Sequence, residues 1–162
     1  MKDKVRLITY SGILSAVIML ATFVIRVPIP NAYGYVNFGD GVIFATAAII
    51  GPFAAICAGL GSALADLIAG YTIYMPATLL IKGAMGLLAG LVLKRRPQLA
   101  LYWLALLFLV CEVIMIGGYF LFESLIYGVE AAAGALLANS IQGAAGVAMG
   151  LVIVPLARRI KF

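Results

Sequence analysis

Apolar residues form six runs along the chain, separated by short breaks that contain glycine, proline or charged residues. Long apolar runs with few charges are typical of helices that cross a membrane. Gly51-Pro52 separates the second run from the third and Met75-Pro76 opens the fourth, since proline disfavours helix at the residue before it and fits the first turn of a new helix. We predict an all-α protein, a single domain over residues 1–162 with six membrane-spanning helices. The predicted helices cover about residues 5–26, 41–50, 52–70, 76–93, 99–124 and 135–157.

The second run is too short to cross a membrane by itself. Ten helical residues span roughly 15 Å, about half of a hydrocarbon core of roughly 30 Å. Either this helix begins earlier, or Asn37 and Asp40 lie below the outer membrane surface, where non-helical backbone is tolerated only if it is buried in protein or lines a cavity. The long segment 27–41 could therefore fold inward as a lid.

Basic residues form three clusters that fix the predicted orientation. Cytoplasmic loops carry an excess of lysine and arginine. With six spans and a cytoplasmic N-terminus, all three clusters fall on the cytoplasmic face, whereas an odd number of spans would place one outside. The clusters are Lys2, Lys4 and Arg6, then Lys94, Arg95 and Arg96, then Arg158, Arg159 and Lys161. We predict that both termini are cytoplasmic. The first run is expected to be a retained span, because it is long for a signal peptide, lacks a small-residue cleavage site and precedes further spans.

Three charged residues lie in or beside consecutive apolar runs. Asp66 falls near the end of the third run, Lys82 lies inside the fourth, and Asp40 lies at the mouth of the second. A charge at membrane depth costs roughly 2.5–3.5 kcal/mol even on the lenient insertion scale, so such residues normally face a protein interior or a wet cavity. The three charges predict a polar pocket. In the alternative interpretation, Asp66 and Lys82 form a structural ion pair with each other.

The polar residues inside the runs gather in the predicted outer half of the membrane. At 1.5 Å per residue from the outer helix ends, Asp66 lies about 6 Å deep, Lys82 about 9 Å, and Asn139 and Gln142 about 6 and 10 Å. Glu112 lies nearer the middle of its helix. A channel or proton relay would carry polar groups through the full depth, whereas an outward-facing binding pocket needs them on one side only. The two amides are alternatively hydrogen-bonding contacts between helices.

Tyrosines lie at the predicted outer interface, at Tyr33, Tyr35, Tyr71 and Tyr74. Such residues either form an aromatic belt at the membrane surface or stack on a flat heterocyclic ligand. The candidate substrate-binding residues are Asn37, Asp40, Asp66, Tyr71, Tyr74, Lys82, Asn139 and Gln142.

Composition and charge exclude several classes of function. The chain is 65% hydrophobic and only 10% charged, with a mean hydropathy of +1.18, far above what a soluble core of this size needs. It has no histidine, so a histidine metal site or general base is excluded, and we expect neither metal nor cofactor. Cys57 and Cys111 lie inside apolar runs, as small buried residues do, which disfavours a disulfide or metal pair. The formal net charge of +5 comes from clusters between apolar runs, a pattern of membrane topology and not of nucleic-acid binding.

Small residues mark one face of the first predicted helix. Ser11, Gly12, Ser15 and Ala16 have the spacing of a smooth stripe that another helix can approach closely. Similar small residues on other helices serve packing within the protein. The stripe therefore either packs internally or docks an external partner.

Between residues 35 and 90 the chain carries an ordered set of short motifs. These are Asn37, Gly39-Asp40, Gly51-Pro52, Gly61, Ala65-Asp66-Leu67, Gly70-Tyr71, Pro76-Ala77-Thr78 and Lys82-Gly83. In this order they resemble the substrate-binding S components of energy-coupling factor (ECF) transporters, most of all the riboflavin-type branch. The motifs cover about a third of the chain, and the six predicted spans, the size and the charge layout extend the resemblance to the whole.

The resemblance implies a small six-helix protein of the bacterial plasma membrane that captures a vitamin or metal ion from outside. Such proteins dock on a membrane scaffold subunit, which couples them to two ATP-binding subunits. Docking in the family uses an Ala-xxx-Ala type motif on the first helix, and Gly12 and Ala16 hold this spacing with glycine at the first position. The chain has no P-loop pattern, so ATP hydrolysis is expected from the partners and no enzyme activity from this chain.

A small heterocyclic vitamin, such as hydroxymethylpyrimidine or pyridoxine, is the expected substrate. Asp40, Asp66 and Lys82 suit a polar heterocycle with hydroxyl groups, while the lack of histidine and of an acidic ligand cluster argues against nickel or cobalt. A riboflavin-specific S component is the alternative within the family. Outside it, a self-sufficient facilitator or small secondary transporter would need gating from both sides, often built from an inverted repeat. We find no convincing repeat, and a membrane enzyme is disfavoured because no nucleophile–base set occurs.

Overall fold

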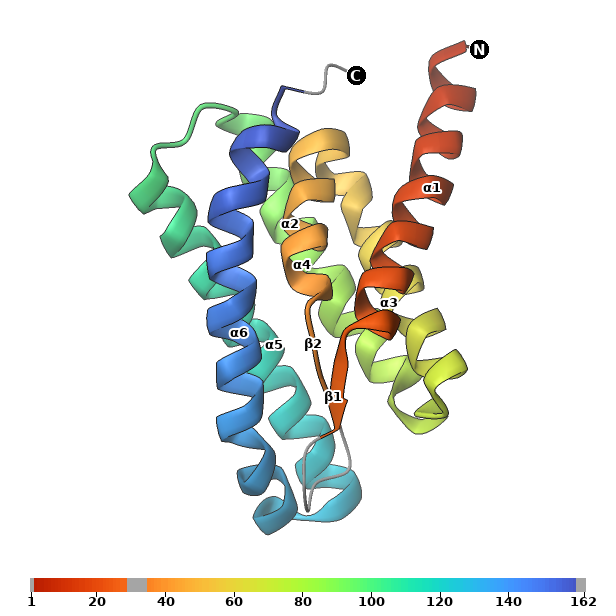
Figure 1. Cartoon of the computed structure of the whole chain (residues 1–162), viewed down its shortest axis with the longest axis vertical. Helices are drawn as coiled ribbons and strands as arrows, with labels where there is room; N and C mark the ends of the chain where they lie inside the picture. The colour runs from red at the N-terminus through yellow and green to blue at the C-terminus, as the bar shows by residue number, and fades with distance from the viewer. Residues whose placement is uncertain (1, 29–34, 160–162) are drawn as a thin grey trace.

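The structure is a computed structural model that describes residues 2–28 and 35–159. It is all-α, as predicted: within these residues six α-helices are joined by short turns and one small antiparallel strand pair (Figure 1). The α-helices are α1 (Lys2–Val24), α2 (Gly39–Ile50), α3 (Ala54–Ala69), α4 (Met75–Arg95), α5 (Leu101–Tyr127) and α6 (Val129–Ala157). The strands are β1 (Arg26–Pro28) and β2 (Tyr35–Asn37), and two 3₁₀ turns are η1 (Gly51–Phe53) and η2 (Thr72–Tyr74).

The chain reverses direction between α2 and α3 at the predicted Gly51-Pro52 break. Gly51 has φ 61° and ψ −138°, a backbone conformation that glycine adopts far more readily than other residues. Gly90 of α4 lies against this turn so closely that a Cβ atom on it would come within 2.7 Å of the Pro52 nitrogen. As a result, α2 runs alongside α4 in the same direction, and α3 returns antiparallel to both (Figure 1).

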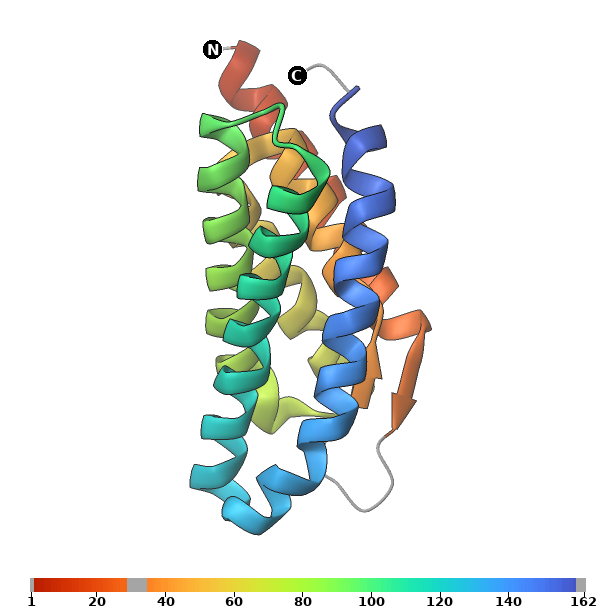
Figure 2. The same ribbon diagram turned by 90° about the vertical axis from the view of Figure 1, so that its left-hand side faces the viewer.

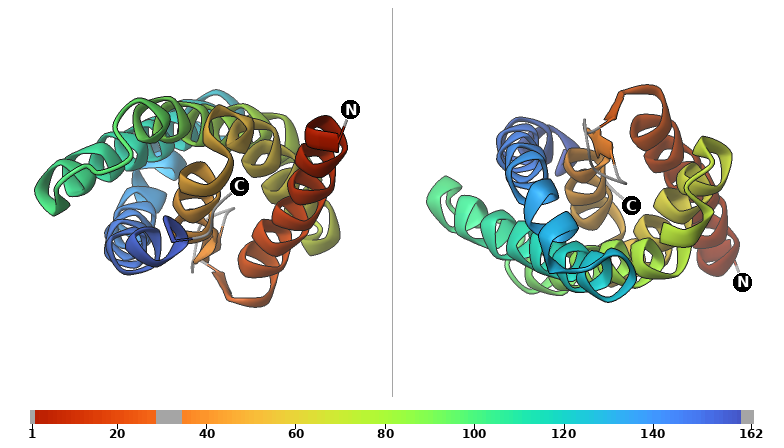
Figure 3. Two further views of the ribbon diagram at one scale, coloured as in Figure 1. Left: turned by 90° about the horizontal axis from the view of Figure 1, so that it is seen from above. Right: turned by 90° about the horizontal axis from the view of Figure 1, so that it is seen from below.

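The short helix α2 lies in the middle of the bundle, against α1, α4 and α6 (Figure 3). It begins at Gly39, two residues before the predicted start, yet its 12 residues still span only about 18 Å. Nine of these residues are buried. A Cβ atom on Gly41 would come within 2.6 Å of the Met149 Cβ atom, so glycine at this position lets α6 approach closely. A helix shorter than the membrane is tolerated here because protein surrounds it.

Five helical stretches are long and apolar enough to cross a membrane, with α2 and α3 counted together as one. They are Lys4–Val24, Gly39–Ala69, Thr72–Arg95, Leu101–Tyr127 and Val129–Ala157. Large apolar side chains such as Ile8, Leu80 and Leu137 are more than 70% exposed on the outer surface, which suits contact with lipid. Helix α1 begins and α6 ends at the same end of the molecule (Figure 1). Six separate spans and cytoplasmic termini remain predictions.

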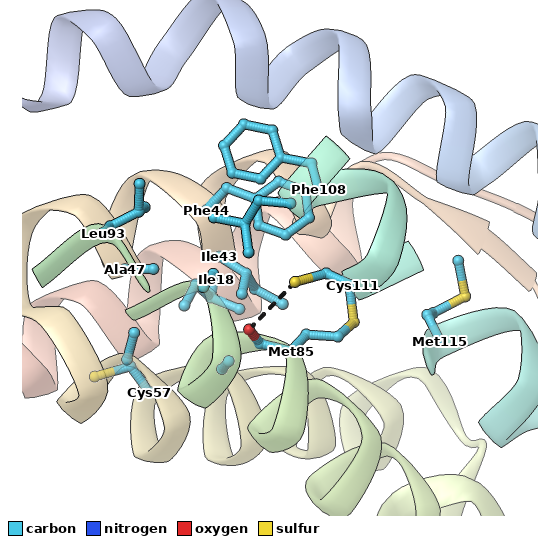
Figure 4. Close-up of a cluster of buried hydrophobic side chains, with 14 of the residues drawn as sticks. Ile18, Ile43, Phe44, Ala47, Cys57, Met85, Leu93, Phe108, Cys111 and Met115 are labelled. Atoms are coloured by element: carbon cyan, nitrogen blue, oxygen red, sulfur yellow. Dashed lines mark hydrogen bonds between the residues drawn. The ribbon is translucent and has the colours of Figure 1, made fainter. Parts of the chain in front are cut away.

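An apolar core packs buried side chains of all six helices against one another, most of them from α2, the start of α3, α4 and the first half of α5 (Figure 4). Phe44 of α2 stacks on Phe108 of α5, with ring centroids 4.2 Å apart. Both rings lie against Gly150 of α6, where a Cβ atom would come within 2.8 Å of Phe44. Cys57 and Cys111 are buried free thiols in this core, as predicted, and the Cys111 thiol donates to the Met85 carbonyl at 3.8 Å.

Two predicted boundaries near the C-terminus are wrong. Helix α5 continues to Tyr127 and α6 begins at Val129, six residues before the predicted start at 135. A single residue, Gly128 with φ 92°, makes the turn between the two antiparallel helices (Figure 2). Glu130 therefore lies in the first turn of α6, where its negative charge suits the positive end of the helix dipole.

The inward-folding lid predicted for residues 27–41 is described only at its two ends. There β1 and β2 pair antiparallel, with Pro28 opposite Tyr35 and Arg26 opposite Asn37. Residues 29–34, including Tyr33, lie outside the described residues. The strand pair was not predicted, and it fixes the backbone of Tyr35 and Asn37 beside the helices.

Candidate functional site

A polar cavity opens in the half of the bundle away from the apolar core. Its walls come from the end of α1, from β2 and η2, from the later parts of α3 and α5, and from the earlier parts of α4 and α6. Counted with its open mouth, the cavity encloses about 420 Å³ of space between atoms, and about 30 Å³ is open to the centre of a water-sized sphere. The lining residues are Thr22, Tyr35, Asn37, Ser62, Asp66, Tyr71, Tyr74, Thr78, Lys82, Tyr119, Glu123, Asn139 and Gln142. Every one of these side chains carries a polar group.

The structure brings the predicted substrate-binding residues together around this one cavity. Seven of the eight line it: Asn37, Asp66, Tyr71, Tyr74, Lys82, Asn139 and Gln142. Asp40 does not line the cavity but lies directly behind its wall, bonded to Lys82 and Gln142. The proximity of these residues is a structural fact, and their role in binding stays a prediction.

A buried network of one ion pair and several hydrogen bonds supports the wall of the cavity. The Lys82 ammonium group forms an ion pair with Asp40 Oδ1, and Gln142 Nε2 donates to Asp40 Oδ2 at 2.7 Å. Gln142 Oε1 in turn accepts the backbone N–H of Asn37 at 2.9 Å. The side chains of Lys82 and Asp40 are 2% and 1% exposed. A buried ion pair persists only when its remaining hydrogen-bonding capacity is met, and Gln142 meets it here for the carboxylate.

Local structure explains why Asp40 occupies this place. It lies in the first turn of α2, where the helix dipole favours a negative charge. Just before it, Asn37 Oδ1 accepts the backbone N–H of Gly39 at 2.9 Å, which satisfies one of the free donors at the helix start. The motif Asn37-x-Gly39-Asp40 thus starts the helix and delivers the carboxylate to Lys82.

Asp66 is bonded to Tyr35 and does not form the alternative ion pair with Lys82. Its Oδ1 atom accepts a hydrogen bond from the Tyr35 hydroxyl at 2.6 Å, while Lys82 pairs with Asp40, so the alternative of a structural Asp66–Lys82 ion pair is wrong. Burial raises the pKa of Tyr35 well above its ordinary value of about 10, and the neighbouring Asp66 carboxylate raises it further. Tyr35 is therefore a protonated donor at physiological pH.

Tyrosine rings form much of the cavity wall. The ring centroids of Tyr35 and Tyr71 are 4.9 Å apart, and those of Tyr71 and Tyr74 are 6.2 Å apart. The Tyr74 hydroxyl donates to Glu123 Oε1 at 3.1 Å, and the Tyr119 hydroxyl shares a 2.9 Å hydrogen bond with a threonine of α4. Tyr74 is only 5% exposed, so an aromatic belt facing lipid is the wrong interpretation for this residue.

Six lining residues were not among the predicted site residues: Thr22, Tyr35, Ser62, Thr78, Tyr119 and Glu123. The spacing of some of these residues could have predicted their place in the cavity. Ser62 lies four residues before Asp66, and Thr78 lies four residues before Lys82. Tyr119 and Glu123 show the same spacing on α5. Residues four apart share one helix face, so each pair had to point into the same space.

The earlier start of α6 moves two predicted residues deeper. Asn139 and Gln142 follow Val129 by 10 and 13 residues, which places them about 15 and 20 Å along the helix. The depths of about 6 and 10 Å expected from a start at 135 are therefore wrong as distances along α6. Both residues are buried and still line the cavity.

Glu112 lies outside the cavity lining, in the middle of α5. It is 1% exposed, and neither of its carboxylate oxygens has a hydrogen-bond partner among the described residues. Gly143 and Gly146 of α6 make room for it, since a Cβ atom on Gly143 would come within 3.2 Å of the Glu112 Cβ atom.

The small-residue stripe on α1 divides between two surfaces. Gly12 and Ala16 are exposed, and a Cβ atom on Gly12 would meet nothing within 4 Å. Ser11 and Ser15 are half-buried against α3: the Ser11 carbonyl accepts from the Cys57 thiol at 3.5 Å, and the Ser15 Oγ donates to the Ser11 carbonyl at 2.7 Å. The serines of the stripe therefore pack internally while Gly12 and Ala16 remain exposed, and docking of a partner on the stripe stays a prediction.

Comparison with known proteins agrees with this architecture. A family model described as "ECF-type riboflavin transporter, S component" matches residues 2–159. The chain is 34% identical over 135 residues to an "Uncharacterized protein in gap 3'region" of Pyrococcus woesei, covering 82% of this chain and 88% of that protein. It is also 35% identical over 134 residues to the "Thiamine precursor transporter HmpT" of Lactococcus lactis subsp. cremoris, covering 82% of this chain and 75% of that protein. With its apolar helices and its match over nearly the whole length, this chain is a multi-pass membrane protein that belongs to the S components of ECF-type transporters.

Proposed function

We propose that this protein is the high-affinity substrate-binding subunit of an ECF-type importer, and that it captures a small heterocyclic vitamin in the polar cavity. The observation that carries this proposal is the polar cavity toward one end of the bundle, in which all described lining side chains are polar, beside an apolar core. Polar groups gathered toward one end suit capture of a ligand better than a channel, which carries polar groups through the full depth of the membrane.

Hydroxymethylpyrimidine and pyridoxine are the vitamins that we favour. The similarity to a protein named as a thiamine precursor transporter supports a small pyrimidine. The small free space of the cavity, about 30 Å³ for the centres of water-sized spheres, also favours a single-ring compound. The description of the matching family supports riboflavin as the alternative substrate.

Transport would require partners that supply energy. Membership of the S-component family supports docking on an ECF scaffold subunit that carries two ATP-binding subunits, in a bacterial plasma membrane. The exposed pair Gly12 and Ala16 on α1 is the proposed docking surface, because small side chains allow another helix to approach closely. Ser11 and Ser15 would support this surface from behind by packing on α3.

Two measurements on the purified protein and its reconstituted complex test this function. Titration calorimetry in detergent with hydroxymethylpyrimidine, pyridoxine and riboflavin should give tight binding of one single-ring vitamin. Uptake of that vitamin into vesicles should require the scaffold and ATP-binding subunits with ATP. Robust uptake by this chain alone would contradict the proposal and identify a facilitator.

A further inference from the structure

We infer that the cavity selects a ligand by its hydrogen-bond donors, and that it takes an amino-substituted or cationic nitrogen heterocycle through Asp66 and Glu123. This inference rests on the proposed function, since it concerns the ligand of the same cavity. It goes further by assigning the two carboxylates as the groups that recognise the ligand through hydrogen bonds.

Asp66 lines the cavity and has one acceptor without a close donor. Its Oδ1 atom is occupied by the Tyr35 hydroxyl at 2.6 Å, while its Oδ2 atom makes no hydrogen bond of ordinary length among the described residues, with the Thr78 side chain also close to the carboxylate. The residue is only 4% exposed. A buried carboxylate oxygen without a donor carries a substantial desolvation cost, so a ligand that donates a hydrogen bond here removes that cost.

Glu123 presents the same arrangement from α5. Its Oε1 atom accepts from the Tyr74 hydroxyl at 3.1 Å, and its Oε2 atom has no partner within the described part of the chain. Glu123 is also 4% exposed and lines the cavity. In the Tyr35–Asp66 and Tyr74–Glu123 pairs the tyrosine donates its single O–H to the carboxylate. Each pair therefore has a carboxylate acceptor, and no tyrosine donor, left for a ligand.

The charges around the cavity also favour a ligand with an amino group or a positive charge. Lys82 is the single basic residue among the described lining residues, and it forms an ion pair with Asp40 behind the wall. Gln142 uses its amide nitrogen on the same carboxylate. Asp66 and Glu123 therefore form no ion pair within the described residues, although Lys82 lies close enough to act on Asp66, and a ligand with an amino group or a protonated ring nitrogen would supply such a pair.

The tyrosine rings suit the same class of ligand. The faces of aromatic rings carry negative electrostatic potential and attract cations as well as flat rings. Tyr35 and Tyr71, with centroids 4.9 Å apart, lie on the Asp66 side, and Tyr74 lies against Glu123. An anionic ligand, such as a phosphorylated vitamin, would meet two carboxylates and these ring faces, which disfavours it.

A matched pair of probes tests this inference. The probes are 4-amino-5-hydroxymethyl-2-methylpyrimidine and its 4-oxo analogue, which has nearly the same shape but a carbonyl acceptor in place of the amino donor and a ring N–H donor in place of the neighbouring ring-nitrogen acceptor. Wild-type protein should bind the amino compound at least tenfold more tightly by titration calorimetry. Asp66→Asn and Glu123→Gln keep the side-chain size and replace one acceptor oxygen by a donor, so at least one should reduce this preference tenfold or more. Ser140→Ala, at an exposed α6 position outside the cavity, should leave it unchanged.

The melting temperature of each variant without ligand separates lost recognition from lost folding. The inference is overturned if wild-type protein binds the 4-oxo analogue as tightly as the amino compound, or if both carboxamide variants keep the wild-type preference. If the protein binds riboflavin but not the aminopyrimidine, and both carboxamide variants bind it like wild type, the inference fails while the proposed transport function stands. If it binds none of the vitamins and the complex imports none, both fail together.

Discussion

Lys82 on α4 forms its ion pair with Asp40 at the start of α2, and Asp66 is held separately by Tyr35. This separation divides the charged residues into two sets. Lys82 and Asp40 neutralise each other in the wall of the cavity, which suits a structural role. Asp66 lines the cavity and keeps one oxygen without a hydrogen-bond partner among the described residues, which suits contact with a ligand.

Breaking the buried ion pair should destabilise the protein. Lys82→Ala leaves Asp40 as an uncompensated buried charge, a change that typically costs about 3–5 kcal/mol in protein interiors. The melting temperature of Lys82→Ala in detergent should fall sharply, and ligand binding should fall with it. The double variant Lys82→Met with Asp40→Asn should recover much of the stability, because no unpaired charge remains. A Lys82→Ala variant with wild-type stability would show that the pair is dispensable.

Removing the Tyr35 hydroxyl should weaken ligand binding more than folding. Tyr35→Phe removes the hydroxyl that holds the Asp66 carboxylate in place, so the carboxylate no longer has one fixed orientation for a ligand. Because Tyr35 lies on β2 at the cavity edge, we expect affinity to fall about tenfold with a small change in melting temperature. Tyr102→Phe on α5, an exposed tyrosine outside the cavity, is the matched control. Equal affinity in Tyr35→Phe and wild type would remove this hydrogen bond from the binding mechanism.

The raised pKa of Tyr35 has a consequence for stability at alkaline pH. The folded protein keeps the phenolic proton above the ordinary pKa of about 10, where an unfolded tyrosine releases it. Stability from this group is therefore fully present below pH 10 and is lost as the pH rises further. Unfolding in detergent between pH 9 and 11.5 should show a smaller alkaline loss for Tyr35→Phe than for wild type. Parallel curves for the two proteins would contradict this assignment.

Bulky residues on the exposed face of α1 should block transport and spare binding. Gly12→Leu or Ala16→Trp adds volume where a Cβ on Gly12 meets nothing, so the fold should accept it while a docking helix should not. ATP-dependent uptake in reconstituted vesicles should be lost, with ligand affinity within about twofold of wild type. Leu137→Trp, at a 74% exposed position on α6, controls for added bulk in the lipid. Uptake that survives both α1 variants would place docking on another face.

The turn after α2 should be intolerant of even one methyl group. A Cβ atom on Gly90 would lie 2.7 Å from the Pro52 nitrogen, and backbone atoms cannot rotate away as a side chain can. Gly90→Ala should therefore lower the unfolding free energy by about 1–3 kcal/mol, the usual cost of overpacking. Gly134→Ala, on an open face of α6, should be neutral or slightly stabilising because alanine favours helix. Equal stability of the two variants would mean that the turn moves freely.

The sequence predicted helix boundaries well where proline marks a break between apolar runs, and less well where no proline is present. Gly51-Pro52 and Met75-Pro76 located two helix starts within two residues, since proline and glycine restrict the backbone directly. The start of α6 was misplaced because residues 125–134 carry no proline, and a single glycine with positive φ makes the turn. The pairing of β1 with β2 left no alternating pattern long enough to detect, because each strand has only three residues.

The sequence predicted those site residues whose polar side chains would be costly to place in the membrane without a polar environment. Asp66, Lys82 and Gln142 stood out because polar groups in apolar runs need a polar environment. Which carboxylate pairs with Lys82 depends on how α2 and α4 lie side by side, and this depends on packing at Gly51 and Gly90 far along the chain. Thr22 and Ser62 gave no distinct signal, because small hydroxyl residues also occur where helices simply touch.

The stacked rings of Phe44 and Phe108 lie in the apolar core beside the cavity. Both side chains are completely buried, Gly150 brings α6 against them, and no buried residue of this core is among the described residues that line the cavity. A polar ligand would have to cross this core to leave by the other end of the bundle. If the chain delivers its ligand across the membrane as proposed, crossing the packed core would be costly for a polar molecule. We therefore expect the mouth of the cavity to be carried from one side of the membrane to the other, with the whole bundle as the moving part.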